Sequence, residues 1–376
     1  MKIAQVAPLY ESCPPRLYGG TERIVYYLTE ELIGLGHEVT LFASGDSQTS
    51  AVLEAPCEQA LRLSDACQDP LIYHLTMLHR VRRRAAEFDI IHFHTDYLHF
   101  PLFADDAVNT LTTQHGRLDL PDLPVIMREF PMMPLVSISV AQQMPLRWAN
   151  WIGTILHGLP RDLHRLGSGG GGYLAFLGRT APEKGPDRAI AISHAAGVPL
   201  QIAAKVDPVD RDYFERAIAP LLQDPLIEFI GEIGENEKGG FLGDAAALLF
   251  PIDWPEPFGL VLIEAMANGT PVIAFGRGSV PEIIEDGVTG FIVDNVAAAA
   301  AAVPLAKQLD RRAIRKRFEE RFTAKRMARD YLTLYQRVLL GGTEAVEPLV
   351  LLDDSEAIEP KLPTFVGRQG LAQAAE

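Results

Sequence analysis

The 376-residue chain has only three cysteines, Cys13, Cys57 and Cys67, and their spacing is not that of a metal site. An odd number of scattered cysteines argues against a disulfide framework. The sequence also lacks any apolar run of the roughly 20 residues that a membrane-spanning helix requires. Its first residues, "MKIAQVAPLY", do not have the pattern of a signal peptide and instead predict a β-strand. We therefore expect a cytoplasmic protein.

Basic residues are in the minority, with 34 Lys and Arg against 49 Asp and Glu, so the formal net charge is −15. Neither half of the chain has a basic excess, which argues against a nucleic-acid partner. An anionic ligand would have to be bound by a few locally placed cations. The length favours two domains, and a hydrophobic content of 48% is enough to form two substantial cores.

Short apolar segments alternate with helical patterns along most of the chain, which predicts an α/β fold with parallel sheets. The expected strands are residues 2–9, 38–44, 89–94, 110–116, 136–140, 154–158, 173–179, 200–206, 227–232, 246–251, 271–276 and 290–295. The run "RLGSGGGG" interrupts this alternation, and its composition is typical of a flexible linker. We therefore expect two Rossmann-like, doubly wound domains that face a central cleft, where such sheets bind ligands.

The expected domains are residues 1–164 and 173–322, joined by the linker at 165–172. A highly charged helix with an apolar stripe covers residues 310–340, and we expect its last part, about 323–340, to pack back on the first domain. Residues 341–376 contain Pro and acidic residues without a sustained period, which predicts a mostly disordered tail.

Two glutamates stand eight residues apart, Glu256 in a proline-rich loop and Glu264 inside an apolar helix pattern. Gly259 permits a sharp entry into that helix, so the free N–H groups of its first turn face back toward Glu256. Glu264 follows about one helical turn further along. Carboxylates accept hydrogen bonds from hydroxyl groups, and N–H groups bind phosphate. This order of groups matches the sugar, diphosphate and ribose of a nucleotide-sugar.

The same spacing, with "EPFG" at the first glutamate, resembles the signature of the retaining glycosyltransferases of family 4 (glycosyl transferases group 1), which have the GT-B fold. The segment "FLGRTAPEKG" at 176–185 is similar to the Gly-Arg and Lys-Gly segment of that family. The resemblance covers roughly residues 1–340. It implies that Arg179 and Lys184 hold the donor diphosphate and stabilise it as it leaves.

By the same resemblance, Glu256 holds hydroxyl groups of the donor sugar and Glu264 holds the nucleotide ribose. The N–H groups of Phe258, Gly259 and Leu260 are expected to face the sugar and the phosphate. The motif is shared by users of UDP-, GDP- and ADP-sugars, so the donor base stays open.

The first half carries related features. "YGGTERIV" resembles the glycine loop of the family, in which Gly19 and Gly20 let the backbone approach the donor phosphate or the acceptor. "TLTTQHG" ends in His115, which resembles the histidine at the cleft wall and is expected to contact the donor sugar or its phosphate. The family usually has Asn-Gly where His157-Gly158 stands, in a hinge region, and we expect this departure to leave the chemistry unchanged.

The resemblance implies a metal-independent front-face transfer with no cofactor and no protein nucleophile, in which the leaving diphosphate helps to deprotonate the acceptor hydroxyl. The product would belong to glycan, glycolipid or small-glycoside biosynthesis, and the acceptor is open. Two alternatives are another GT-B nucleotide-sugar enzyme, such as an epimerase, and a non-catalytic nucleotide-sugar binding protein.

Three further clusters have a structural and a functional interpretation. The histidines and aspartate of "HFHTDYLH" (His92, His94, Asp96 and His99) either line an acceptor pocket, bind a metal or belong to the core. The D-x-D of Asp210 and Asp212 opens a helix pattern, which predicts a helix cap rather than a metal site. "HRVRRR" at 79–84 is a solvated cationic helix face or a peripheral contact with anionic lipid.

Overall fold

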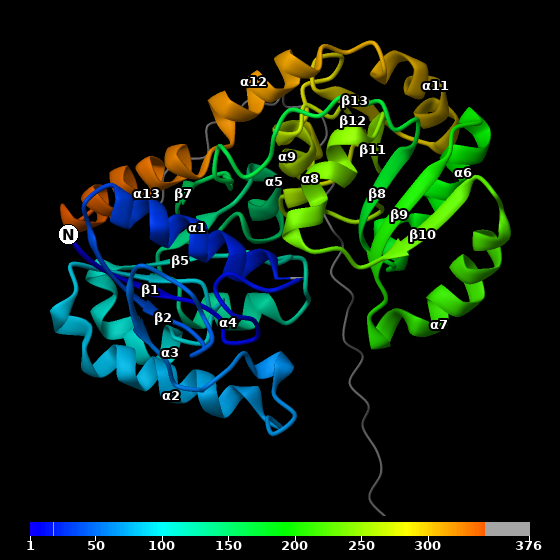
Figure 1. The fold of residues 1–376 in the computed structure, drawn as a ribbon. Coiled ribbons are helices and arrows are strands. Elements are labelled where there is room, and N and C mark those ends of the chain that lie inside the picture. Colours follow the sequence, from blue (N-terminus) through cyan, green and yellow to red (C-terminus); the bar gives the residue numbers. More distant parts are fainter. Residues whose placement is uncertain (18, 343–376) are drawn as a thin grey trace, which may run out of the picture. The chain divides into compact units, whose positions relative to one another are not determined.

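The structure, a computed structural model, describes residues 1–17 and 19–342 (Figure 1). These residues form two sheets in which every pairing between neighbouring strands is parallel. The first sheet has the order β3-β2-β1-β4-β5-β6-β7 and the second the order β10-β9-β8-β11-β12-β13. In each sheet the chain runs outward from a central strand in both directions. The predicted α/β class and the two doubly wound sheets are confirmed.

The strands of the first sheet are β1 (Lys2–Val6), β2 (Glu38–Phe42), β3 (Val52–Glu54), β4 (Ile90–Phe93), β5 (Thr110–Thr113), β6 (Leu135–Ser137) and β7 (Trp151–Thr154). Those of the second are β8 (Leu174–Arg179), β9 (Leu200–Lys205), β10 (Ile227–Gly231), β11 (Ala247–Phe250), β12 (Val272–Phe275) and β13 (Gly290–Val293). The central strands β4, β5, β11 and β12 are buried along their whole length, because helices cover both faces of a parallel sheet.

The helices in the first half are α1 (Gly20–Gly34), α2 (Pro70–Arg83), α3 (Phe100–Phe103), α4 (Leu123–Glu129) and α5 (Val140–Gln143). Those in the second half are α6 (Pro186–Ala196), α7 (Arg211–Tyr213), α8 (Glu235–Asp244), α9 (Leu260–Ala267), α10 (Val280–Ile283), α11 (Val296–Ala306), α12 (Arg311–Arg321) and α13 (Ala324–Leu339). The apolar period of the first helix places Ile24, Leu28 and Leu32 in the core, as its sequence predicts.

The charged segment at 310–340 was expected to be one helix, and this is wrong. It forms α12, which ends with its C-cap at Phe322, and α13, which Thr323 caps by accepting a hydrogen bond from the N–H of Arg326 at 3.2 Å. The apolar stripe of α13, which includes Tyr331 and Tyr335, is buried in the core of the first sheet. Figure 1 shows α13 beside α1, with which it makes its main helix contact.

The two connections between the halves cross where Leu159 meets Thr323. The N–H of Leu159 donates to the carbonyl of Phe322 at 2.9 Å, and the N–H of Ala324 donates to the carbonyl of Leu159 at 2.7 Å. The crossing directly follows residues 154–158, which were expected to form a strand. The strand lies earlier, at β7, so residues 155–159 are free to lead out of the first sheet.

Gly158 allows the two crossing segments to approach, since a Cβ at this position would lie 2.3 Å from the carbonyl oxygen of Thr323. We therefore predict that Gly158→Ala destabilises the protein by about 2–3 kcal/mol, because the backbones must separate. Thermal denaturation followed by circular dichroism should show a melting point several degrees lower. Gly34→Ala is the matched control, since a Cβ there meets nothing within 4 Å. Equal melting points for the two variants would contradict the prediction.

The glycine-rich run at 165–172 packs on the second half and is not a free linker. Its backbone donates three hydrogen bonds to carbonyls of that half, from Gly167 to Asn268 at 2.9 Å, from Gly169 to Gly243 at 3.0 Å and from Gly171 to Asp244 at 2.9 Å. Missing side chains make this close approach possible, so the glycines here serve packing as well as connection.

The cationic run at 79–84 lies at the end of α2. Part of its charge is used locally, since Arg84 pairs with Glu54 at 2.5 Å and with Glu87 at 2.8 Å, and Arg80 donates to the carbonyl of Ala55 at 3.0 Å. Within residues 1–17 and 19–342, no helix combines the length and apolar content needed to cross a membrane. Lipid contact and a cytoplasmic location stay predictions. The tail expected to be disordered, 341–376, lies outside the described residues from 343 onward.

Candidate active site

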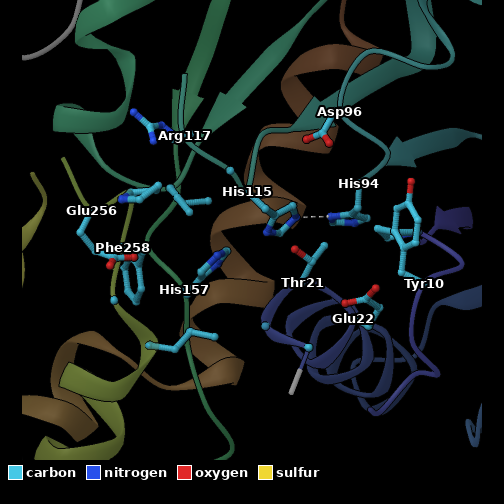
Figure 2. Close-up of a pocket in the computed structure, with 18 of the residues that line it drawn as sticks. Tyr10, Thr21, Glu22, His94, Asp96, His115, Arg117, His157, Glu256 and Phe258 are labelled. Carbon is cyan, nitrogen blue, oxygen red and sulfur yellow. Dashed lines mark hydrogen bonds between the residues drawn. The ribbon is translucent and has the colours of Figure 1, made fainter. Parts of the chain in front are cut away.

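A cavity of about 600 Å³ lies at the carboxyl ends of the central strands of both sheets. Residues that follow β1, β4 and β5 line one side of it, and residues that follow β8 and β11 line the other. Both sets start at the point where each strand order reverses, which is where open α/β sheets bind ligands. Figure 2 shows this space with His115 near its centre, Glu256 and Phe258 on one side and Tyr10, Glu22 and Asp96 on the other.

Two of the predicted site residues, Lys184 and Glu256, form an ion pair at the wall formed by the second half. The ammonium of Lys184 lies 2.6 Å from Oε2 of Glu256 and 4.4 Å from the ring centre of Trp254. The indole N–H of Trp254 donates to the same carboxylate oxygen at 3.0 Å. Glu256 is only 8% exposed, so this ion pair is held in one geometry at the edge of the cavity.

Arg179, at the end of β8, also lines the cavity and is surrounded by carboxylates. Its guanidinium lies 2.8 Å from Glu183, 3.7 Å from Asp207 and 3.5 Å from Asp210. The prediction that Asp210 caps a helix is wrong, because its side chain makes no capping hydrogen bond and turns toward Arg179 instead. The chain from 208 to 223 forms a series of short helical turns rather than one helix.

The loop after β11 presents backbone donors to the cavity. Phe258, Gly259 and Leu260 all line it, and α9 begins at Leu260, directly after Gly259 as expected. Gly259 has a φ of 80°, which a residue with a side chain adopts only with strain. Within the described part of the chain, the N–H groups of Phe258 and Gly259 have no hydrogen-bond acceptor. These groups and the first turn of α9 are therefore available to an anion.

Glu264 does not line this cavity; it belongs to a buried ion cluster beside it. The ammonium of Lys238 lies 2.7 Å from Glu264 and 3.2 Å from Glu235, and Arg23 of α1 lies 2.7 Å from Glu235. Burial would raise the pKa of Glu264, but Lys238 together with His164 and Arg23 holds it below its ordinary value. The cluster therefore keeps an ionised carboxylate one helical turn beyond the loop, and it links α1 to α8 and α9.

Sequence reasoning missed Lys238, Glu235 and Arg23. Lys238 and Glu235 lie on α8, which has the sequence "ENEKGGFLGD". Its two adjacent glycines and weak apolar period do not predict a helix. Arg23 lies next to the glycine loop, and its position after Gly19 and Gly20 is the one signal that could have found it. Gly20 is the first residue of α1, and both glycines line the cavity as expected.

His115 ends a chain of buried hydrogen bonds that begins at the C-terminal helix. Nε2 of Gln5 donates to the hydroxyl of Tyr335 at 3.0 Å, and Oε1 of Gln5 accepts from Nε2 of His94 at 2.8 Å. Nδ1 of His94 then lies 2.8 Å from Nε2 of His115 (Figure 2). With the Gln5 amide placed in this way, His94 carries its proton on Nε2, and His115 must donate from Nε2.

This arrangement leaves Nδ1 of His115 as an unprotonated acceptor. The atom is buried and has no partner among the described residues. Burial lowers the pKa of His115 to about 3, so the ring is neutral at physiological pH. His115 can therefore accept a hydrogen bond from a hydroxyl group, whereas phosphate, which only accepts, would find no N–H on this side of the ring. Of the two predicted contacts, the donor sugar is the one that fits.

His157 also lines the cavity, so its expected place in a hinge region is corrected, while its effect on the chemistry stays a prediction. Its ring stacks on His115 with centroids 5.2 Å apart and contacts Phe258 edge-on at 4.9 Å. The side chain is 3% exposed, and its Nδ1 has no partner in the described part of the chain. Since β7 ends at Thr154, residue 157 lies at the cavity rather than in a remote hinge.

The remaining histidines of "HFHTDYLH" are divided between core and cavity. His92 bonds to Tyr335 and Thr113, and His99 stacks on Phe93 and bonds to Thr112, so both are core residues. His94 and Asp96 line the cavity. Among residues 1–17 and 19–342, no three His, Cys, Asp or Glu side chains are grouped so that they could hold a metal ion.

Solved structures share this architecture. AviGT4, a glycosyltransferase involved in avilamycin A biosynthesis, is 23% identical, covers 91% of this chain and 98% of its own, and superimposes with a TM-score of 0.71. HepE of Anabaena, solved in complex with UDP and glucose, is 17% identical, with 89% and 99% coverage and a TM-score of 0.65. The two doubly wound sheets are therefore those of the GT-B class of glycosyltransferase structures.

Two family profiles match overlapping parts of the chain, "Glycosyltransferase Family 4" at residues 18–196 and "Glycosyl transferases group 1" at residues 166–325. Together with the shared architecture, these matches support a family 4-like glycosyltransferase of the GT-B class, as the motifs predicted. A curated relative, the D-inositol 3-phosphate glycosyltransferase of Mycolicibacterium vanbaalenii, is 33% identical over 135 residues. That match covers 32% of this chain and 30% of the relative, so it spans about a third of either protein.

Proposed function

We propose that this protein is a retaining glycosyltransferase that moves a sugar from a nucleoside diphosphate to an acceptor hydroxyl without a metal ion. The observation that carries the proposal is the Lys184–Glu256 ion pair, which lies at the same cavity as Arg179 and the free N–H groups of Phe258 and Gly259. Two cations and a set of backbone donors at one wall fit a diphosphate. HepE, which shares the fold, was solved with UDP and glucose.

The residues divide the donor between them. Arg179, Lys184 and the amides before α9 would bind the diphosphate, Glu256 and His115 would accept hydroxyls of the sugar, and Glu264 would accept those of the ribose. Glu264 is ionised and lies beside the cavity, so the ribose would have to approach the Lys238 cluster. These groups bind the ribose, the diphosphate and the sugar, which UDP-, GDP- and ADP-sugars share, so the proposed donor is any one of these three.

The transfer proceeds on one face of the sugar. The bond from C1 to the diphosphate oxygen breaks, and its electron pair leaves with the diphosphate, whose charge Arg179 and Lys184 stabilise. The acceptor oxygen attacks C1 from the same side, and its proton passes to the departing diphosphate. The products are a glycoside with the configuration of the donor and a nucleoside diphosphate. No cofactor enters this scheme.

The epimerase and the non-catalytic binding protein would share the donor wall but would need no second wall. The cavity has one, formed by loops after β1, β4 and β5, and this supports a reaction with an acceptor. We propose a role in glycan, glycolipid or small-glycoside biosynthesis on the same ground.

A thermal-shift panel with UDP, GDP, ADP and their glucose conjugates tests donor binding. We predict that one nucleotide series raises the melting point of the wild type, and that Glu264→Gln weakens its affinity at least tenfold. The variant should fold, because Glu235 still pairs with Lys238. Glu320→Gln, at an exposed residue of α12 outside the cavity, is the matched control. If no nucleotide shifts the wild type, the proposed function is wrong.

A further inference from the structure

The side of the cavity opposite Glu256 is lined by carboxyl groups and tyrosines. We call it the acceptor wall and define it by Tyr10 after β1, Glu22 in α1, and Asp96 and Tyr97 after β4. Figure 2 shows Tyr10, Glu22 and Asp96 around the same space, on the far side of His115 from Glu256. The inference drawn from it rests on the proposed function, because it concerns the second substrate of the same site.

Asp96 has an unusual backbone conformation and a carboxylate that has no partner in the described part of the fold. Among the described residues it is the one non-glycine residue at positive φ, at 51°, a backbone state that costs free energy and is often found at functional sites. Its carboxylate is exposed to the cavity and forms no hydrogen bond or ion pair with any described residue. The surrounding protein removes hydration and raises the pKa of Asp96 to about 6.

The cations near this wall are already neutralised. Arg62 pairs with Glu11 at 2.8 Å, and Arg117 holds both oxygens of Asp119 at 2.6 Å. These are the two cations that the first half contributes to the lining among the described residues. A phosphate or carboxylate on the acceptor would therefore meet carboxyl groups and paired arginines here, without the free N–H groups that accompany the paired cations of the donor wall.

The polar atoms of the wall instead accept hydrogen bonds, so they favour a ligand that carries hydrogen-bond donors. The carboxylate of Asp96 is an acceptor, and Glu22 adds a second carboxyl group, one oxygen of which already binds the N–H of Glu11 at 3.2 Å. At the same cavity, the buried Nδ1 of His157 also has no partner among the described residues, as is expected of an atom that binds a polar ligand. Tyr10 is 41% exposed, with the guanidinium of Arg62 over its ring at 5.9 Å, and the ring surface that stays exposed can contact the apolar side of a sugar ring.

We propose that the acceptor is a hydroxyl-rich sugar or polyol with no phosphate or carboxylate near its reacting hydroxyl, and that Asp96 and Tyr10 bind it. Asp96 accepts hydrogen bonds from two hydroxyls of the acceptor, and the tyrosine ring packs against its carbon-bound hydrogens. The hydroxyl that reacts then faces the donor across His115.

The test uses the full chain and the labelled nucleotide-sugar that the thermal-shift panel selects. One reaction contains a mixture of neutral acceptors (glucose, maltose, trehalose, myo-inositol and glycerol), and a parallel reaction contains their phosphate monoesters. Products are separated by anion exchange, and hydrolysis of the donor to water is measured in both. We expect label in the neutral products at a rate at least tenfold above that in the phosphate esters.

Asp96→Asn is the diagnostic variant, because asparagine tolerates positive φ as aspartate does. We expect it to lower the ratio of transfer to hydrolysis at least tenfold, whereas Asp105→Asn, at an exposed position outside the cavity, should keep the wild-type ratio. Equal or faster use of the phosphate esters overturns the inference, and so does donor hydrolysis without transfer to either mixture. So does an unchanged ratio in Asp96→Asn. A protein that neither binds nor hydrolyses any nucleotide-sugar shows instead that the proposed function has failed.

Discussion

Lys184→Ala should lower kcat for cleavage of the nucleotide-sugar by at least 100-fold. In the proposed reaction the ammonium of Lys184 stabilises negative charge that appears on the diphosphate only as the bond to C1 breaks. Removing one such donor from a preorganised site costs about 10²–10³ in rate. The loss should appear in kcat more than in KM, because the interaction strengthens in the transition state. The same reasoning applies to Arg179→Ala.

The variant also removes the partner of a nearly buried carboxylate, since Glu256 would keep only the indole N–H of Trp254. A melting curve must therefore accompany the kinetics, so that loss of the charge is not mistaken for loss of the fold. Lys307→Ala is the matched control, because this lysine is exposed at the end of α11 and lies outside the cavity. Release of nucleoside diphosphate is the readout, and it requires no knowledge of the acceptor. A folded Lys184→Ala protein with a kcat within threefold of the wild type would rule out the assigned role.

The parts of the site that lie close together in the sequence could be predicted from it. Glu256, Phe258 and Gly259 occupy one loop, and the alternation of strands and helices shows that this loop follows a buried strand. Because parallel strands of one sheet end at the same edge, Arg179 and Lys184 could be expected near that loop although they lie about 75 residues away. The structure places all five at one cavity.

The parts that depend on contacts between distant segments could not be predicted. The tautomer of His115 is set by Gln5, 89 residues from His94, and by Tyr335, 330 residues from Gln5. No local pattern encodes such a chain of hydrogen bonds. The partner of Glu264 lies on α8, and the two glycines of that helix weaken its helical sequence pattern. His157 lies at the cavity because β7 ends a few residues earlier than the apolar residues of this segment suggested.

The buried histidines should make the protein unstable in mild acid. Burial lowers the pKa of His92, His94, His99, His115 and His157 far below the ordinary value, and that of His115 to about 3. The unfolded chain binds more protons than the folded one once the pH falls below about 6.5, so the free energy of unfolding falls with it. Each such histidine costs about 1.4 kcal/mol for every pH unit below that value.

Carboxyl groups with a raised pKa act in the opposite direction, and the largest of these shifts are at Glu22 and Asp96. Burial raises the pKa of Glu22 to about 7 and loss of hydration raises that of Asp96 to about 6, so the folded state takes up these protons first and gains stability as the pH falls toward about 4. The buried histidines outweigh these carboxyl groups, and we expect a net loss of several kcal/mol between pH 7 and pH 5.5. This is a large part of the 5–15 kcal/mol that typically separates folded from unfolded protein.

Urea denaturation at pH 7.5, 6.5 and 5.5 measures this loss directly. His99→Gln removes one of the buried groups and should reduce the dependence of the free energy of unfolding on pH by about 1.4 kcal/mol per unit below pH 6.5, whatever its effect at pH 7.5. His79→Gln, at an exposed position of α2, should leave that dependence as it is in the wild type. The slope is the decisive quantity, because a purely structural effect of His99→Gln lowers the stability equally at every pH. A free energy of unfolding that stays constant or rises from pH 7.5 to 5.5 would mean that the histidines are not held neutral in the fold, and the assignment of Nδ1 of His115 as a bare acceptor would fail with it.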